Sequence, residues 1–127
     1  MNNRHLLIIF LGIMVVMLAA CGSSPTEPTA DLAAGEALFK SGGGSGIPCI
    51  TCHTLDGSAL VGPSLEGIGQ RAGEQIPDVT AEEYIRQSIV DPSAYLVSGY
   101  SDAMNKTYGA TLSEEDIDNL IAFLMTQ

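Results

Sequence analysis

Apolar side chains recur at helical spacing in three separate segments of the chain. In the first, residues 32–40, Asp31 can cap the N-terminus, and a Ser/Gly-rich stretch at residues 41–46 ends the periodicity. One stripe of this segment is apolar and consists of Leu32, Gly35, Leu38 and Phe39. The spacing predicts a short amphipathic helix that turns this stripe toward a core.

The second and third segments open with capping patterns. Thr80 and Glu83 form a capping box for one helix, which the Asp-Pro pair at residues 91–92 ends. Ser113 and Asp116 indicate a similar cap for the last helix. The apolar positions at helical spacing are Tyr84, Ile85 and Ile89 in one helix and Ile117, Leu120, Ile121 and Leu124 in the other.

Between these helices the chain lacks a regular pattern. Residues 61–78 are rich in glycine and proline, with scattered apolar residues only, which predicts a long wrapping loop without regular structure. No segment shows sustained strand alternation. We therefore expect an all-α domain of three to four short helices joined by long loops. Such helices bury little core by themselves, and covering a cofactor is a task that explains a loop of this length.

The N-terminal residues predict export. A polar start containing Arg4 precedes an uncharged apolar run at residues 6–18, the profile of a signal peptide and short of the about 20 apolar residues that a spanning helix needs. Residues 18–22, Leu-Ala-Ala-Cys-Gly, resemble the lipobox of bacterial lipoproteins. The resemblance implies cleavage before Cys21 and acylation of its thiol, so that Cys21 holds the protein to membrane lipid. The alternative is an ordinary signal peptide followed by a free cysteine.

Three parts follow from this reading. Residues 1–20 are a lipoprotein signal peptide, residues 21–30 are the lipid-anchored cysteine and a flexible linker, and residues 31–127 are one domain. We expect a lipoprotein on the periplasmic or outer face of a bacterial membrane. The sequence carries 15 acidic and 5 basic residues, a net charge of −10, which argues against a nucleic-acid partner. Such a charge favours steering toward a basic patch on a partner, and it equally fits a well-solvated surface.

Residues 49–53, Cys-Ile-Thr-Cys-His, form the attachment pattern of c-type haem. One helical turn places the thiols of Cys49 and Cys52 under the two vinyl groups of a porphyrin, with His53 beneath the iron. A thioredoxin-type dithiol requires a βαβ setting that is not visible, and a zinc site requires four ligands. A disulfide would leave His53 unused. The motif predicts one covalent haem c with His53 as an axial ligand of the iron.

The candidates for the second axial ligand of the iron can be narrowed by elimination. Signal cleavage removes His5, so two histidine ligands from one chain are excluded, and Met104 and Met125 are the methionines that remain. Met125 lies in the last turn of the final helix, where methionine usually fills a gap in the core. Met104 lies in an irregular segment between helices. The sequence favours Met104, with Met125, a lysine or an open position as alternatives.

From residue 31 to the C-terminus, the chain resembles the class I monohaem cytochromes c. It is especially similar to the cytochrome domain of haem–copper oxidase subunit II and to small cytochrome subunits of respiratory complexes. Besides the attachment motif, the resemblance rests on residues 62–67, Gly-Pro-Ser-Leu-Glu-Gly, and on the stretch from Tyr84 to Gly109 that brings the methionine sulfur to the iron. It implies the class I cytochrome c fold around one haem.

The resemblance also assigns roles to single residues. It implies that the Pro63 carbonyl accepts a hydrogen bond from His53, that Arg71 lies near a haem propionate, and that Tyr100 belongs to the haem environment. Gly35 and Phe39 match residues that pack on the last helix, with Phe123 as the aromatic partner. Two features depart from the family. Asn105 replaces the usual proline after the methionine, and residues 42–48 add what we expect to be a flexible flap.

The resulting hypothesis is a membrane-anchored electron carrier and not an enzyme, because no second histidine is available as a catalytic base. Its expected partner is a respiratory complex such as a terminal oxidase or a quinol-oxidising complex. A haem-based sensor or small-ligand-binding lipoprotein with a displaceable sixth ligand is the alternative. A thiol-based assembly lipoprotein without haem is a third class.

Overall fold

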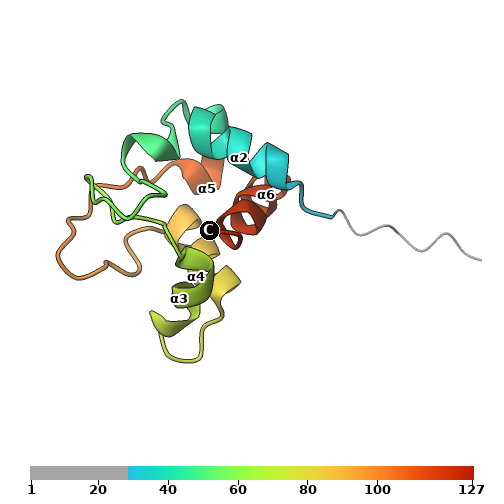
Figure 1. The fold of residues 1–127 in the computed structure, drawn as a ribbon. Helices are drawn as coiled ribbons and strands as arrows, with labels where there is room; N and C mark the ends of the chain where they lie inside the picture. The colour runs from blue at the N-terminus through green and yellow to red at the C-terminus, as the bar shows by residue number, and fades with distance from the viewer. Residues whose placement is uncertain (1–28) are drawn as a thin grey trace, which may run out of the picture.

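The computed structural model describes residues 29–127, and in this range the chain consists of helices, turns and loops without a strand (Figure 1). The α-helices are α2 (Leu32–Ser41), α3 (Ile68–Arg71), α4 (Ala81–Val90), α5 (Tyr108–Thr111) and α6 (Glu114–Leu124). Three single 3-10 turns are η1 (Gly43–Ser45), η2 (Cys49–Thr51) and η3 (Ala72–Glu74). This confirms the all-α prediction. The predicted signal peptide and Cys21 lie outside the described residues, and no helix within residues 29–127 has the length and apolarity to cross a bilayer.

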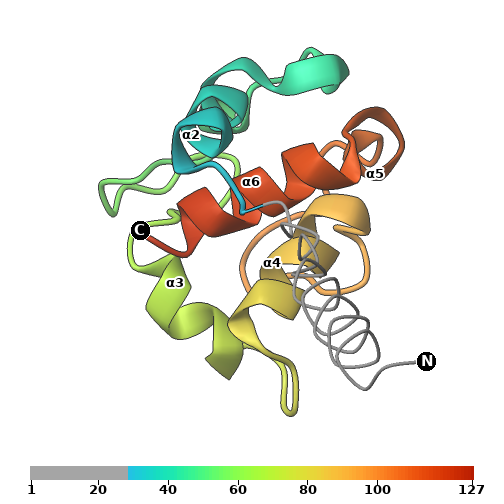
Figure 2. The same cartoon turned by 90° about the vertical axis from the view of Figure 1, so that its right-hand side faces the viewer.

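Helix α6 runs through the middle of the fold, and α2 packs directly against it (Figure 2). A Cβ atom on Gly35 would lie 2.0 Å from the Asn119 carbonyl oxygen, so only glycine allows this approach. The rings of Phe39 and Phe123 meet at 5.7 Å between centroids, which confirms the expected aromatic pair. Leu32 was expected on the same apolar stripe, but it is 50 % exposed at the first position of α2, while Gly35 and Phe39 further along the stripe are buried.

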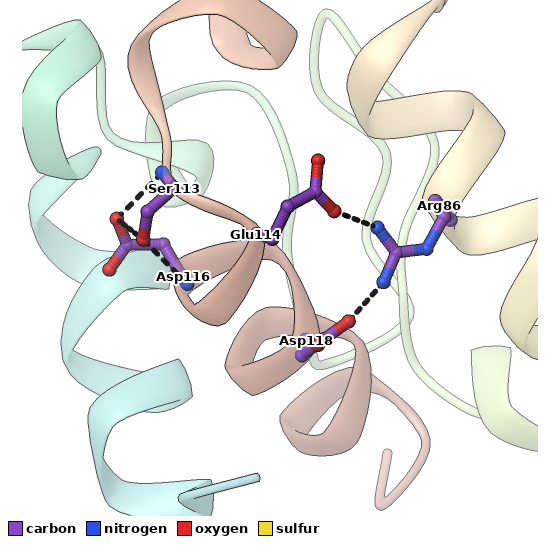
Figure 3. A network of polar contacts seen from close by, with 5 residues as sticks. All are labelled: Arg86, Ser113, Glu114, Asp116 and Asp118. Atoms are coloured by element: carbon purple, nitrogen blue, oxygen red, sulfur yellow. Dashed lines mark hydrogen bonds and ion pairs between the residues drawn. The ribbon is translucent and has the colours of Figure 1, made fainter. Parts of the chain in front are cut away.

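Helix α4 packs against α6 from the other side. Both predicted capping boxes are present, Thr80 with Glu83 on α4 and Ser113 with Asp116 on α6. Arg86 of α4 joins the two helices from the surface, since its guanidinium contacts Glu114 at 2.8 Å and also Asp118 (Figure 3). The predicted apolar faces of both helices are buried in one core.

The prediction that residues 61–78 lack regular structure is wrong, because α3 and η3 lie there. Ile68 is buried in the core, and the backbone at Gly69 comes so close to the Met125 carbonyl that a Cβ would lie 2.3 Å from its oxygen. The C-terminal end of α6 therefore stabilises this single turn. A contact between residues so distant in sequence leaves no periodic signal in the local pattern.

Residues 42–48 form a compact turn where we expected a flexible flap. Gly42 ends α2 with a φ of 76°, and the Ser45 hydroxyl donates a hydrogen bond of 2.6 Å to the Gly42 carbonyl. The Tyr108 hydroxyl of α5 donates to the Ile47 carbonyl at 2.7 Å. This insertion is thus held against α5 and leads the chain directly into η2.

Candidate functional site

The turn η2 brings Cys49, Cys52 and His53 to one wall of a cavity. The backbone N–H groups of Cys52 and His53 both donate to the Cys49 carbonyl, at 3.1 and 3.0 Å. Both cysteines are half-buried free thiols. Burial is the main cause that raises the pKa of Cys49, and the neighbouring Cys52 adds to it. The Cys49 thiol is therefore held neutral. An apolar wall suits the neutral thioethers that two cysteines can form.

His53 is held as a neutral imidazole with one nitrogen available. Its Nδ1 lies 2.9 Å from the Pro63 carbonyl oxygen, and because a carbonyl only accepts, Nδ1 carries the proton. Burial lowers the pKa of His53, while the hydrogen bond to Pro63 opposes this effect. The lone pair of Nε2 is then free to bind a metal, and the hydrogen bond from Nδ1 to the Pro63 carbonyl fixes the orientation of the ring.

Residues 62–65 form the support behind the imidazole. The N–H of Gly62 donates to the Cys52 carbonyl at 2.9 Å, and the N–H of Leu65 donates to the Thr54 carbonyl at 2.8 Å. A Cβ atom on Gly62 would lie 2.5 Å from Cε1 of His53, so the ring rests on the bare glycine backbone. The sequence reasoning assigned Pro63 and missed Gly62, although a glycine before that proline was a usable signal.

The cavity has a volume of about 400 Å³, within the range of sites for cofactors and other small molecules. Its lining joins the η2 wall to residues 92–105, and the segments that carry the two walls lie on the same side of the helices (Figure 1). Met104 lines the cavity. Met125 does not, and it packs against the core instead. Within residues 29–127, no lysine lines the cavity either.

The two residues assigned to the haem environment also reach the cavity. Arg71 lines it, and its guanidinium donates to the backbone carbonyls of Ser64 and Glu66. Tyr100 lines it as a half-buried side chain. Their roles toward a bound group stay predictions. Within residues 29–127, no cluster of three or more His, Cys, Asp or Glu residues offers a rival metal site.

Two thiols one turn apart, a pre-oriented imidazole and a thioether around one apolar cavity define a protein that attaches haem covalently. The arrangement fits the group, because each required ligand type lies on the cavity wall and Gly62 leaves room behind the imidazole. When bound, haem iron supplies a one-electron couple. The protein then has to tune the reduction potential of the haem and to bind its redox partners.

Residues 32–127 match the family model for cytochrome c, and the chain belongs to this family. No curated protein matches the chain. Members of the family bind haem c covalently, typically one per domain, and generally carry electrons without catalysing a reaction of their own. The protein is accordingly an electron-transfer haem protein with haem c as its cofactor.

Proposed function

We propose that this protein carries single electrons to or from a complex of a respiratory or photosynthetic chain while lipid on Cys21 attaches it to the outer or periplasmic face of a bacterial membrane. One observation carries the proposal: Met104 lines the same cavity as Cys49, Cys52 and His53. With His53 and Met104 as the two axial ligands, the iron has no open position for a substrate. Electron transfer at the haem edge is then the remaining activity.

Carbon monoxide distinguishes this function from the sensor alternative. We expect the reduced holoprotein to show no prompt spectral change at neutral pH, because the Met104 sulfur occupies the iron. The Met104→Ala variant should bind carbon monoxide at once, whereas Met125→Leu should behave as the wild type. Prompt binding by the wild type would support a haem sensor. A negative haem stain after denaturing electrophoresis, in cells competent for cytochrome maturation, would favour the thiol-based class.

The surface around the cavity supports a docking role. We call Ile47, Val61, Tyr95 and Leu96 the apolar rim, because these cavity-lining side chains are 36 to 60 % exposed. Apolar side chains gathered at one opening are typical of a contact surface. In the proposed complex, the rim meets an apolar patch beside the partner's redox centre.

The charges indicate the chemistry of that partner. Each basic side chain within residues 29–127 is already engaged internally: Lys40 with Glu36, Arg86 with Glu114 and Asp118, Lys106 with Asp102, and Arg71 with backbone carbonyls. Against the 15 acidic residues of the whole chain, this leaves a strongly acidic exterior. We infer a partner with basic groups around its apolar patch, such as a haem–copper oxidase or a quinol-oxidising complex.

Two leucines offer a matched test. Leu96 belongs to the apolar rim and is 46 % exposed, while Leu32 is 50 % exposed and does not line the cavity. With a purified partner complex, Leu96→Glu should slow electron transfer at least tenfold and Leu32→Glu less than twofold. The wild-type rate should fall as salt is added. Equal effects of the two variants, or a rate that rises with salt, would contradict this surface.

The anchor is tested separately. We expect Cys21→Ser to release the protein from the membrane fraction or to leave it with an uncleaved signal peptide, because lipid is added to that thiol. Fractionation followed by mass measurement of the mature N-terminus reads this out. Unchanged membrane attachment of the variant would remove the lipid anchor from the proposal and leave the haem chemistry untouched.

A further inference from the structure

The side chain of Asn105, directly after Met104, has a fixed orientation. Its Oδ1 accepts hydrogen bonds from the Thr107 N–H at 3.2 Å and from the Thr107 hydroxyl at 3.1 Å. A backbone N–H can only donate, so the amide oxygen must face Thr107 and the NH2 group must point away from it.

The NH2 group of Asn105 is buried and has no hydrogen-bond acceptor among residues 29–127. Leaving a buried donor unsatisfied is costly, and such groups are uncommon in native proteins. Asn105 and Met104 both line the cavity. The missing acceptor is therefore expected to arrive with the haem, or to be a cavity side chain that moves when haem is bound.

The position of Asn105 separates these two sources. Burial raises the pKa of the Tyr108 hydroxyl, the nearby Cys49 thiol adds to the rise, and the nearby side chains of Ser45 and Asn105 oppose it. Tyr108 also donates to Ile47, two residues before Cys49. Asn105 thus lies on the cysteine side of the cavity. The cysteines bind the vinyl edge of the porphyrin, and the propionates leave from the opposite edge, so a propionate is out of reach.

We propose that Asn105 is a positioning residue for the axial methionine, and that its NH2 group donates a hydrogen bond to the Met104 sulfur when that sulfur is bound to iron. The inference rests on Met104 being the ligand, as proposed above. Such a bond holds the thioether in one orientation. It also draws electron density from the sulfur, which favours ferrous over ferric iron and raises the reduction potential.

Three holoprotein variants test this role. Asn105→Asp keeps the acceptor for Thr107 and removes the donor, and Asn105→Ala removes both. Thr107→Val removes only the hydroxyl contact and keeps the NH2 group. Imidazole displaces methionine from ferric haem, and loss of the iron–sulfur charge-transfer band reports the displacement. We expect half-displacement at roughly fivefold lower imidazole in both Asn105 variants, the equivalent of one ordinary hydrogen bond.

The reduction potential should also fall in Asn105→Ala, while Thr107→Val should stay within twofold of the wild type in imidazole affinity. In the reduced wild type, proton NMR should show contact between the Asn105 NH2 group and the Met104 methyl group. Wild-type imidazole affinity in both Asn105 variants would overturn the proposal, and so would an NH2 contact to Tyr108 in place of Met104. Absence of the charge-transfer band in the wild type would instead contradict Met104 as the ligand.

Discussion

The two walls of the cavity are built in different ways. On the His53 side, backbone hydrogen bonds join residues far apart in sequence, from Gly62 to Cys52 and from Leu65 to Thr54. On the Met104 side, the backbone bonds of residues 92–106 connect only residues two or three positions apart. The longer-range contacts on this side are made by side chains, because the Asp102 carboxylate accepts hydrogen bonds from Ser93 and Lys106.

This difference indicates how the two proposed iron ligands, His53 and Met104, are held. The imidazole is fixed by groups that cannot rotate, namely a backbone carbonyl and a bare glycine. The methionine lies on a loop that is held by contacts between exposed polar side chains. Water competes with these contacts and weakens them. We expect changes on the His53 side to affect assembly of the holoprotein, and changes on the Met104 side to affect ligand exchange and potential.

The largest expected effect is that of Gly62→Ala. The added Cβ would lie 2.5 Å from Cε1 and 2.8 Å from Nδ1 of His53, and neither the ring nor the backbone can shift, since both are hydrogen-bonded. We expect a loss of about 3 kcal/mol in the free energy of unfolding, the upper end of overpacking costs, together with a lower yield of covalent haem. Thermal unfolding and a haem stain measure the two.

Gly73→Ala is the matched control for this substitution. A Cβ there would meet its nearest atom, the Ala81 nitrogen, at 3.6 Å, an ordinary contact. This variant should retain the wild-type haem yield. If both alanine variants assembled equally well, the rigid support behind His53 would not be needed, and the contrast between the two walls would fail.

A smaller effect is expected at the Tyr108–Ile47 hydrogen bond, which links the α5 end of the Met104 segment to the chain before Cys49. Tyr108→Phe removes the donor to the Ile47 carbonyl and keeps the buried ring. We expect a loss of about 1 kcal/mol, or roughly 4–8 °C in Tm. Tyr100→Phe serves as the control. An unchanged Tm would mean that water replaces the donor and that the two walls are not tied at this point.

The sequence predicted what is encoded locally. Helices α2, α4 and α6 were recognised because their caps and apolar spacing lie within a few residues, and the Cys49 to His53 motif is contiguous. Features that depend on distant contacts were missed. The single turn α3 is stabilised by the end of α6, and the role of Gly62 follows from the imidazole packed against it. Leu32 is exposed because it stands at the first position of α2.

The Arg86 contacts test the helical scaffold apart from both walls. Arg86 joins α4 to Glu114 and Asp118 of α6 and does not line the cavity. Because its side chain is 37 % exposed, Arg86→Met should cost less than about 1 kcal/mol, and the cost should shrink in high salt. Urea unfolding at two salt concentrations measures it. A change in the charge-transfer band would show that the scaffold and the Met104 side are coupled.

The smallest expected effect is that of acid on the Met104 side. Hydrogen bonding by Lys106, and then by Ser93, holds the pKa of Asp102 below its ordinary value of 3.8. Its contacts are therefore complete above pH 4 and are lost as pH falls through the lowered pKa, so imidazole should displace Met104 more easily in acid. Asp56 near His53 also has a lowered pKa, caused by Ser58. Asp102→Asn should abolish this acid effect on displacement, and Asp56→Asn should leave it intact. The reverse result would place the acid-sensitive contact on the His53 side and invert the contrast between the walls.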